Sequence, residues 1–214
     1  MTPQEIITEV RRLIQDETET YRYSDTFMLG LANQALKRMA VLRPDLFAYV
    51  GTVTCTAGEV IQSAPSDSIR VIEVYSIVGG NALTETNRET MDQNVPTWPN
   101  DTAAAATNWF RNVRNPNKFY IYPQAPADQV LNVEYAQTPS DYAIDATITL
   151  LPDAYFPVLV DMVVWLAESV DNESVSNGRA KMFQDSYSQA LGLSTQSRSI
   201  TDTEEGGLAD EEVV

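Results

Sequence analysis

Hydrophobic residues at helical spacing occur near both ends of the chain, in two stretches at each end. Thr2 and Glu5 have the spacing of a capping box, and a stripe of isoleucine, valine and leucine follows over residues 6–14. A second stripe begins after Ser24, a suitable N-cap, and ends near Leu42, because Pro44 disfavours helical angles at the residue before it. The pattern therefore predicts two amphipathic helices within the first 48 residues.

The second pair of helices is predicted close to the C-terminal end. The third helix opens at Leu151 and is apolar in nearly every direction as far as Leu166, so we expect it to be the most buried of the four. Pro157 is expected to bend its first turns. The fourth helix carries the apolar residues from Met182 to Leu191 and ends at a glycine.

Between the two pairs the period changes from that of a helix to that of a strand. The strongest strand signal is 69–78, followed by a glycine turn, and 119–122 is a second strand with 130–135 as the partner that follows. The segment 85–111 is polar and contains two prolines, which favours a long loop with at most one short helical turn. The middle of the chain is therefore expected to form a small antiparallel sheet or sandwich.

These elements predict an α+β fold in which the N- and C-terminal helix pairs build one helix bundle. A long insertion between two halves of a helical core requires those halves to meet in space. The predicted parts are 1–48 and 149–193 for the helices of the bundle, 49–148 for the inserted antiparallel β domain, and 194–214 for an extended acidic tail.

Composition narrows the function classes. With 14 Lys and Arg against 30 Asp and Glu, the net charge of -16 would repel a phosphate backbone, so stable nucleic-acid binding is not expected. The absence of histidine removes the commonest general base and metal ligand. We predict no catalytic residue, metal or cofactor. No apolar run is long enough for a membrane span, and the first residues lack a secretory signal, which favours synthesis in a cytoplasm.

Two residues could be chemically reactive, but a structural role is expected for each of them. Asp161 interrupts the third helix and could be a functional acid, but we expect a polar-face residue that pairs with an arginine, with Arg12, Arg38 and Arg179 as the candidates. Cys55, the only cysteine, is expected to be an inert buried thiol, since no histidine is present to activate it.

Two segments are candidates for binding a partner. The tail beyond Leu193 has too few apolar residues to order by itself, so we expect a neighbouring subunit or another partner to hold it. Its apolar anchors are Leu208, Val213 and Val214. Large aromatic residues in the polar middle segment either fold back onto the sheet or contact a partner, and both readings stay open here. They are Trp98, Trp109 and Phe110.

Several blocks of the chain, in this order, resemble bacteriophage head-to-tail adaptor proteins. The blocks are Arg22 to Asp25, Met28 to Asn33, Leu42 to Leu46, Phe119 to Pro123, Val133 to Ala136, Leu151 to Asp161 and Arg179 to Gly192. Each block recurs in unrelated folds, whereas their order and spacing together are more specific. The resemblance covers roughly residues 3–192 and leaves the tail outside.

The resemblance implies a virion structural protein at the head–tail interface. Relatives form a ring, dodecameric in known cases, beneath the portal vertex, which they join to a tail or nozzle protein, and some insert a C-terminal arm into the portal. DNA would then pass through the ring only in transit. Two alternatives remain: a hydrolase of glycan or cell wall that uses Asp92 and Asp101 beside the tryptophans, and a tail-tube or decoration protein.

Overall fold

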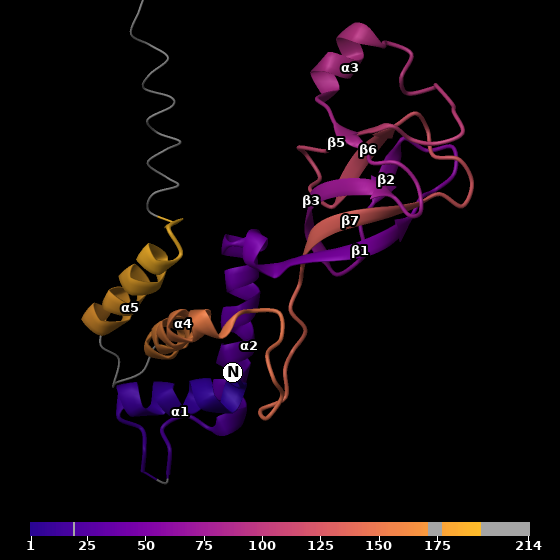
Figure 1. Cartoon of the computed structure of the whole chain (residues 1–214). Coiled ribbons are helices and arrows are strands. Elements are labelled where there is room, and N and C mark those ends of the chain that lie inside the picture. The colour runs from indigo at the N-terminus through magenta and orange to yellow at the C-terminus, as the bar shows by residue number, and fades with distance from the viewer. Residues whose placement is uncertain (19, 171–176, 194–214) are drawn as a thin grey trace, which may run out of the picture. The chain divides into compact units, whose positions relative to one another are not determined.

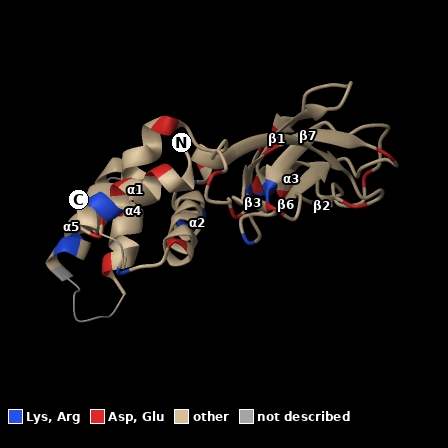
Figure 2. Cartoon of the chain, turned by 90° about the horizontal axis from the view of Figure 1, so that it is seen from below, with Lys and Arg blue, Asp and Glu red and all other residues tan. Residues whose placement is uncertain are grey.

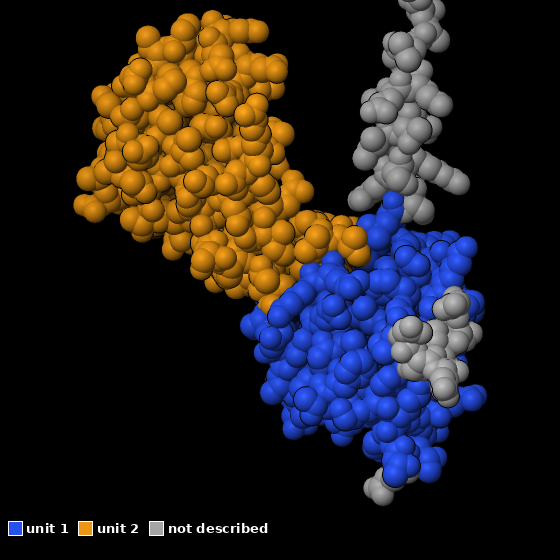
Figure 3. All heavy atoms as spheres, turned by 180° about the vertical axis from the view of Figure 1, so that it is seen from behind, with its two compact units in different colours: residues 1–38, 140–214 blue, residues 39–139 orange. Residues whose placement is uncertain are grey.

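The computed structural model describes residues 1–18, 20–170 and 177–193 (Figure 1). The fold is α+β, as the sequence predicts, with helices at both ends of the chain and two small sheets between them. Two compact units make up the chain (Figure 3): unit 1 comprises Met1–Arg38 and the chain from Ser140 onwards, and unit 2 comprises Met39–Pro139. Each unit is described by itself below.

Unit 1 begins with α1 (Pro3–Ile14), whose first turn has the predicted capping box. Thr2 Oγ1 accepts the backbone N–H of Glu5 at 3.2 Å, and the Glu5 carboxylate accepts the N–H of Thr2 at 2.8 Å. These bonds satisfy N–H groups that the helix leaves without partners. Gln15 then takes a left-handed φ of 59° and ends the helix.

The most buried helix of unit 1 is α4 (Phe156–Glu168), which packs against α1 and against α5 (Asn177–Ala190). The buried face of α1 includes Ile6, Ile7 and Val10, and Leu159 and Val163 of α4 are fully buried. Segments from opposite ends of the sequence thus share one core, because each helix alone leaves an apolar face exposed to water.

Hydrogen bonds and contacts with aromatic rings also connect the segments of unit 1. The second helix, α2 (Asp25–Leu42), places the Arg38 guanidinium 5.1 Å from the centre of the Trp165 ring, and Tyr187 of α5 lies 5.5 Å from the same ring. The Tyr23 hydroxyl donates to the carbonyl of Ala167 at 3.0 Å. Asn33 of α2 exchanges two hydrogen bonds with the backbone of Tyr142, at 2.9 and 3.1 Å.

Unit 2 contains two sheets that share one core. The first has the order β1-β7-β3 and consists of β1 (Ala48–Thr54), β7 (Val130–Gln137) and β3 (Ser68–Ile77), all antiparallel. The second has the order β2-β6-β5-β4 and consists of β2 (Ile61–Ser63), β6 (Lys118–Tyr122), β5 (Asn108–Arg111) and β4 (Thr84–Glu85). Val74, Val133 and Leu131 from one sheet meet Trp109, Phe119 and Ile121 from the other.

The outer face of the second sheet has a smaller cluster of its own. Alternate residues of a strand point to opposite faces, so Trp109 enters the core between the sheets while Phe110 lies on the outer face. There Phe110 packs with Trp98 and with Met91 of α3 (Arg88–Asn94). Tyr120 stacks on the Phe110 ring, with the ring centres 4.8 Å apart.

Several expectations for the middle segment were wrong. Segment 85–111 is not a long loop, because it contains α3 and the strand β5; Asn87 caps α3 through the N–H of Glu89 at 3.0 Å. The inserted region is not purely antiparallel, since β4 and β5 pair in parallel. The strand 130–135 does not pair with 119–122: β7 lies between β1 and β3.

Pro157 is the second residue of α4, and the expected bend of the first turns stays a prediction. A short 3-10 helix, η2 (Asp153–Tyr155), precedes α4, and the proline lies in the first turn, where its missing N–H removes no intrahelical bond. A second 3-10 helix, η1 (Pro44–Phe47), connects α2 to β1.

Candidate interaction surface

The basic side chains of unit 2 gather at one place. Its only basic residues are Arg43, Arg70, Arg88, Arg111, Arg114 and Lys118. All of them except Arg43 line two adjoining clefts beside β5, β6 and the loop between these strands. Acidic positions are spread along the chain in both units (Figure 2). We call this cationic region the β5–β6 surface.

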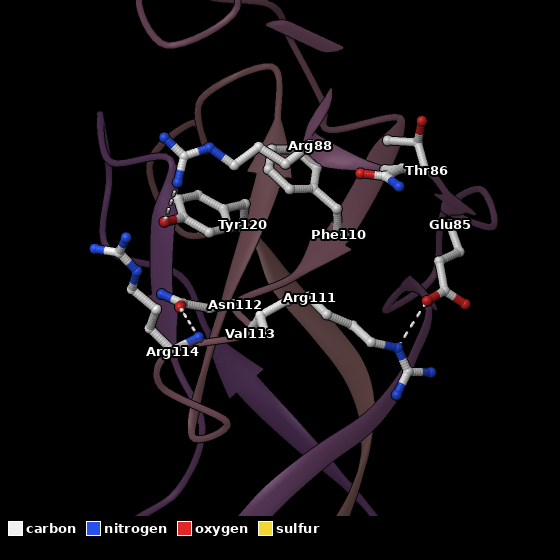
Figure 4. Close-up of a pocket in the computed structure, with 10 residues that line it drawn as sticks. Glu85, Thr86, Arg88, Phe110, Arg111, Asn112, Val113, Arg114 and Tyr120 are labelled. Carbon is white, nitrogen blue, oxygen red and sulfur yellow. Dashed lines mark hydrogen bonds and ion pairs between the residues drawn. The ribbon is translucent and has the colours of Figure 1, made fainter. Parts of the chain in front are cut away.

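The larger cleft, of about 500 Å³, has an aromatic floor and charged sides (Figure 4). Phe110 and Tyr120 form the floor, and the Arg88 guanidinium lies 5.6 Å from the centre of the Tyr120 ring. Arg111 points to the opposite side of the cleft, where it pairs with Glu85 at 2.8 Å. Cations and aromatic rings in one open cleft suit a ligand that is acidic and partly apolar.

Asparagine side chains shape the loop between β5 and β6. Asn112 Oδ1 accepts the backbone N–H groups of Arg114 and Asn115 at 3.2 and 3.0 Å, and the carbonyl of Asn115 accepts the N–H of Lys118 at 2.9 Å. This local bonding leaves Val113, at the tip, 94% exposed. An apolar side chain therefore projects into solvent among the cations.

The cations of this surface differ in how far they are neutralised. Arg111 pairs with Glu85, and Arg88 lies 3.6 Å from Asp92. Within the described part of the chain, no ion pair involves Arg70, Arg114 or Lys118. A partner with carboxylates would meet these three charges without having to displace an existing ion pair.

A second exposed feature of unit 2 is apolar and lies around the start of β1. Val41 is 66% exposed and Val50 is 53% exposed, and Leu42 and Tyr49 are also exposed. Strand β1 is an edge of its sheet, so the backbone groups on one side of it have no partner strand within unit 2. Edge strands with apolar side chains are common places for contact with another chain.

The three aromatic residues predicted as partner contacts are core residues in this chain. Trp98, Trp109 and Phe110 are 4%, 1% and 1% exposed. Of the two readings left open by the sequence, the structure therefore shows the one in which they fold back onto the sheet. The polar surroundings in sequence were misleading, because the prolines and α3 return the chain over the outer face of the second sheet.

The acidic residues proposed for the alternative hydrolase have structural partners. Asp92 accepts a hydrogen bond from Trp98 Nε1 at 2.7 Å, and Asp101 accepts from the Tyr122 hydroxyl at 3.3 Å. The prediction that Asp161 pairs with an arginine was wrong. The Asp161 carboxylate accepts a hydrogen bond from the Ser186 hydroxyl at 2.6 Å. Among the described residues, no group of three or more His, Cys, Asp and Glu could hold a metal ion.

Cys55 lies in the core between the sheets and is 7% exposed. Burial disfavours the charged thiolate and raises the pKa of this thiol to about 11. The side chain is thus a protonated, unreactive thiol at neutral pH, in agreement with the expectation that Cys55 is an inert buried residue.

The tail anchors Leu208, Val213 and Val214 lie outside the described residues.

The sequence analysis did not identify the β5–β6 surface, although a signal was present: Arg111, Arg114 and Lys118 fall close together in a chain with few cations. Within the described residues, no helix is long and apolar enough to cross a membrane.

The chain has a recognisable family. Residues 1–206 match the family model described as SU10 adaptor protein. A match over nearly all of the 214 residues shows that the chain belongs to this family, and the resemblance to head-to-tail adaptors inferred from the sequence is thereby confirmed. No curated protein matches the chain.

Proposed function

From this membership we propose that the chain is the subunit of a ring in the phage virion that joins the portal to the tail and forms part of the channel for DNA. The observation that carries the proposal is the adaptor family match over residues 1–206. An adaptor acts by shape: it offers one surface to the portal, another to the tail, and a passage between them.

The charge of the chain supports a role as a conduit. Each copy has a net charge of -16, so a ring of copies would repel the phosphate backbone. DNA could pass such a wall without being retained, since counterion release, the main source of non-specific affinity, requires basic contacts.

The β1 edge supports contact between copies. Tyr49 and Val50, which are 49% and 53% exposed, lie on an edge strand and would lose water on contact with another chain. Burial of apolar area is the main source of stability in subunit interfaces. We propose that this edge belongs to the interface between neighbours, in a ring that, by analogy with relatives, has twelve copies.

The proposal is tested by imaging the purified full chain mixed with its portal and by measuring its mass in solution. We expect rings seated on one end of the portal. The double variant Tyr49→Asp with Val50→Asp should remain monomeric, whereas Val78→Asp should assemble; Val78 is 48% exposed in the wild type and lies in the turn that follows β3, the strand at the opposite edge of the sheet. A chain that never binds the portal would refute the adaptor role, and unchanged assembly of the double variant would refute the β1 interface.

A further inference from the structure

We propose that the β5–β6 surface binds the acidic segment 202–214 of a neighbouring copy of this chain. The surface is the cationic pair of clefts beside β5 and β6, lined by Arg70, Arg88, Arg111, Arg114 and Lys118. The inference rests on the proposed function for the presence of a neighbouring copy. From the sequence alone, the partner of the tail was either a neighbouring subunit or another protein. The inference assigns it to a neighbouring subunit.

The first argument is charge complementarity. The segment contains acidic residues and no cation: they are Asp202, Glu204, Glu205, Asp210, Glu211 and Glu212. The β5–β6 surface holds Arg70, Arg114 and Lys118, none of which forms an ion pair among the described residues, beside Arg88, whose contact with Asp92 is 3.6 Å long. In a chain this acidic, such a group of cations is the natural counterpart of an anionic segment.

The second argument is that both sides are also partly apolar. Val113 is 94% exposed at the rim of the larger cleft, and the partly exposed ring of Tyr120 lies on its floor. The tail segment carries Leu208 and ends in a pair of valines. An acidic segment with spaced apolar residues can pair its carboxylates with the arginines and lay an apolar side chain on Val113.

A tail segment is favoured over DNA because of the charge of the whole molecule. The net charge of -16 opposes the approach of a polyanion such as DNA, and the cations of the surface are few and partly neutralised by Glu85 and Asp92. A tail tethered to an adjacent copy has an effective concentration on the order of millimolar, which allows weak ion pairs to form. The contact should weaken as salt is raised.

The experiment measures binding of a fluorescent peptide of residues 200–214 by fluorescence anisotropy. The acceptor is the full-length chain in which the acidic side chains of the tail are neutralised by D202N, E204Q, E205Q, D210N, E211Q and E212Q, so that its own tail does not compete. We expect saturable binding, at least about tenfold weaker when Arg114→Glu or Lys118→Glu is added. The matched control Lys181→Glu changes an exposed lysine of α5 by the same charge and should bind as before.

Several outcomes would overturn the proposal. Binding that is unchanged in Arg114→Glu and Lys118→Glu, or equal binding of a peptide with neutral residues in place of its acids, removes the cationic surface as the site. Duplex DNA that binds this surface while the peptide does not would assign it to nucleic acid instead. None of these results depends on the ring assay. Failure of this proposal and failure of the adaptor role are therefore distinguishable.

The neighbouring copy is tested by zero-length carbodiimide cross-linking of rings assembled from mixed ¹⁵N-labelled and unlabelled full chains. We expect Lys118 joined to a tail carboxylate, with about half of the linked pairs carrying one label, as random mixing of copies requires. Linked pairs that always carry the same label would place the tail on its own copy and overturn the proposal.

Discussion

The buried charge of Arg11 gives the sharpest test of how unit 1 is held together. Its side chain is 8% exposed and donates to Asp16 at 2.8 Å, to the carbonyl of Tyr23 at 2.8 Å and to Asp25 at 2.7 Å. These bonds fix the connection between α1 and α2. Replacing Arg11 by alanine would leave the carboxylate of Asp16, also 8% exposed, without its counterion.

The expected cost follows from the partners that remain. Loss of one member of a buried ion pair costs about 3–5 kcal/mol. Asp16 still accepts the backbone N–H of Arg22 at 2.7 Å, and the Asp25 carboxylate is 61% exposed and regains water. We therefore expect Arg11→Ala to destabilise unit 1 by about 3 kcal/mol, near the lower end of that range.

Hydrogen exchange of the α1 amides, followed by mass spectrometry, measures this locally. A loss of about 3 kcal/mol corresponds to roughly a hundredfold faster exchange through the opening of unit 1. Arg12→Ala is the matched control: Arg12 is 65% exposed and pairs with Glu9, so its removal should cost less than about 1 kcal/mol. The double variant Arg11→Met with Asp16→Leu should recover part of the loss. Equal exchange in Arg11→Ala and Arg12→Ala would refute the reasoning.

Three further predictions concern single side chains. Asn33→Ala removes both hydrogen bonds to the backbone of Tyr142 and should destabilise unit 1 by about 1–3 kcal/mol in urea unfolding, whereas Gln34→Ala, on the exposed side of α2, should change little. Cys55, with its pKa raised to about 11, should react with iodoacetamide at pH 8 only after denaturant is added; rapid reaction of the native chain would contradict its burial. The hydrogen bond from Arg43 lowers the pKa of Asp45, so its stabilisation is present above the unfolded pKa and is lost as the pH falls through the folded pKa. Asp45→Asn should thus cost less than about 1 kcal/mol at neutral pH and nothing in strong acid, and a cost that persists in acid would exclude the ion pair as its source.

Local sequence signals were reliable where one short segment contains all the necessary information. The capping box of α1 and the Ser24 cap before α2 involve residues only three apart, and both form as expected. The alternation in 69–78 predicts β3 almost to the residue. The sequence pattern did not locate the small helix α3. This helix has one buried side chain, Met91, so its hydrophobic stripe is too short to recognise.

The order of strands and the fate of the aromatic residues depended on the tertiary structure. The pairing of β7 with β1 and β3 joins residues from 54 apart (Ile77 and Leu131) to 88 apart (Ala48 and Ala136) in the sequence, and alternation within a strand does not specify its neighbour. Trp98 and Phe110 are buried only because α3 and the following loop cover the outer face of the second sheet. The cationic surface arises similarly, since Arg70 of β3, Arg88 of α3 and Arg114 of the β5–β6 loop line the two adjoining clefts only in the folded chain.

The sequence by itself determined the elements with strong periodicity, the net charge and the adaptor family, because these follow from residue types and their order along the chain. The tertiary structure decided which side chains meet. Trp109 could be assigned to the core, and Arg114 to a cleft, only once the sheets were formed. Contacts between distant segments depend on the packing of whole elements, and that packing is a property of the complete fold rather than of any local pattern.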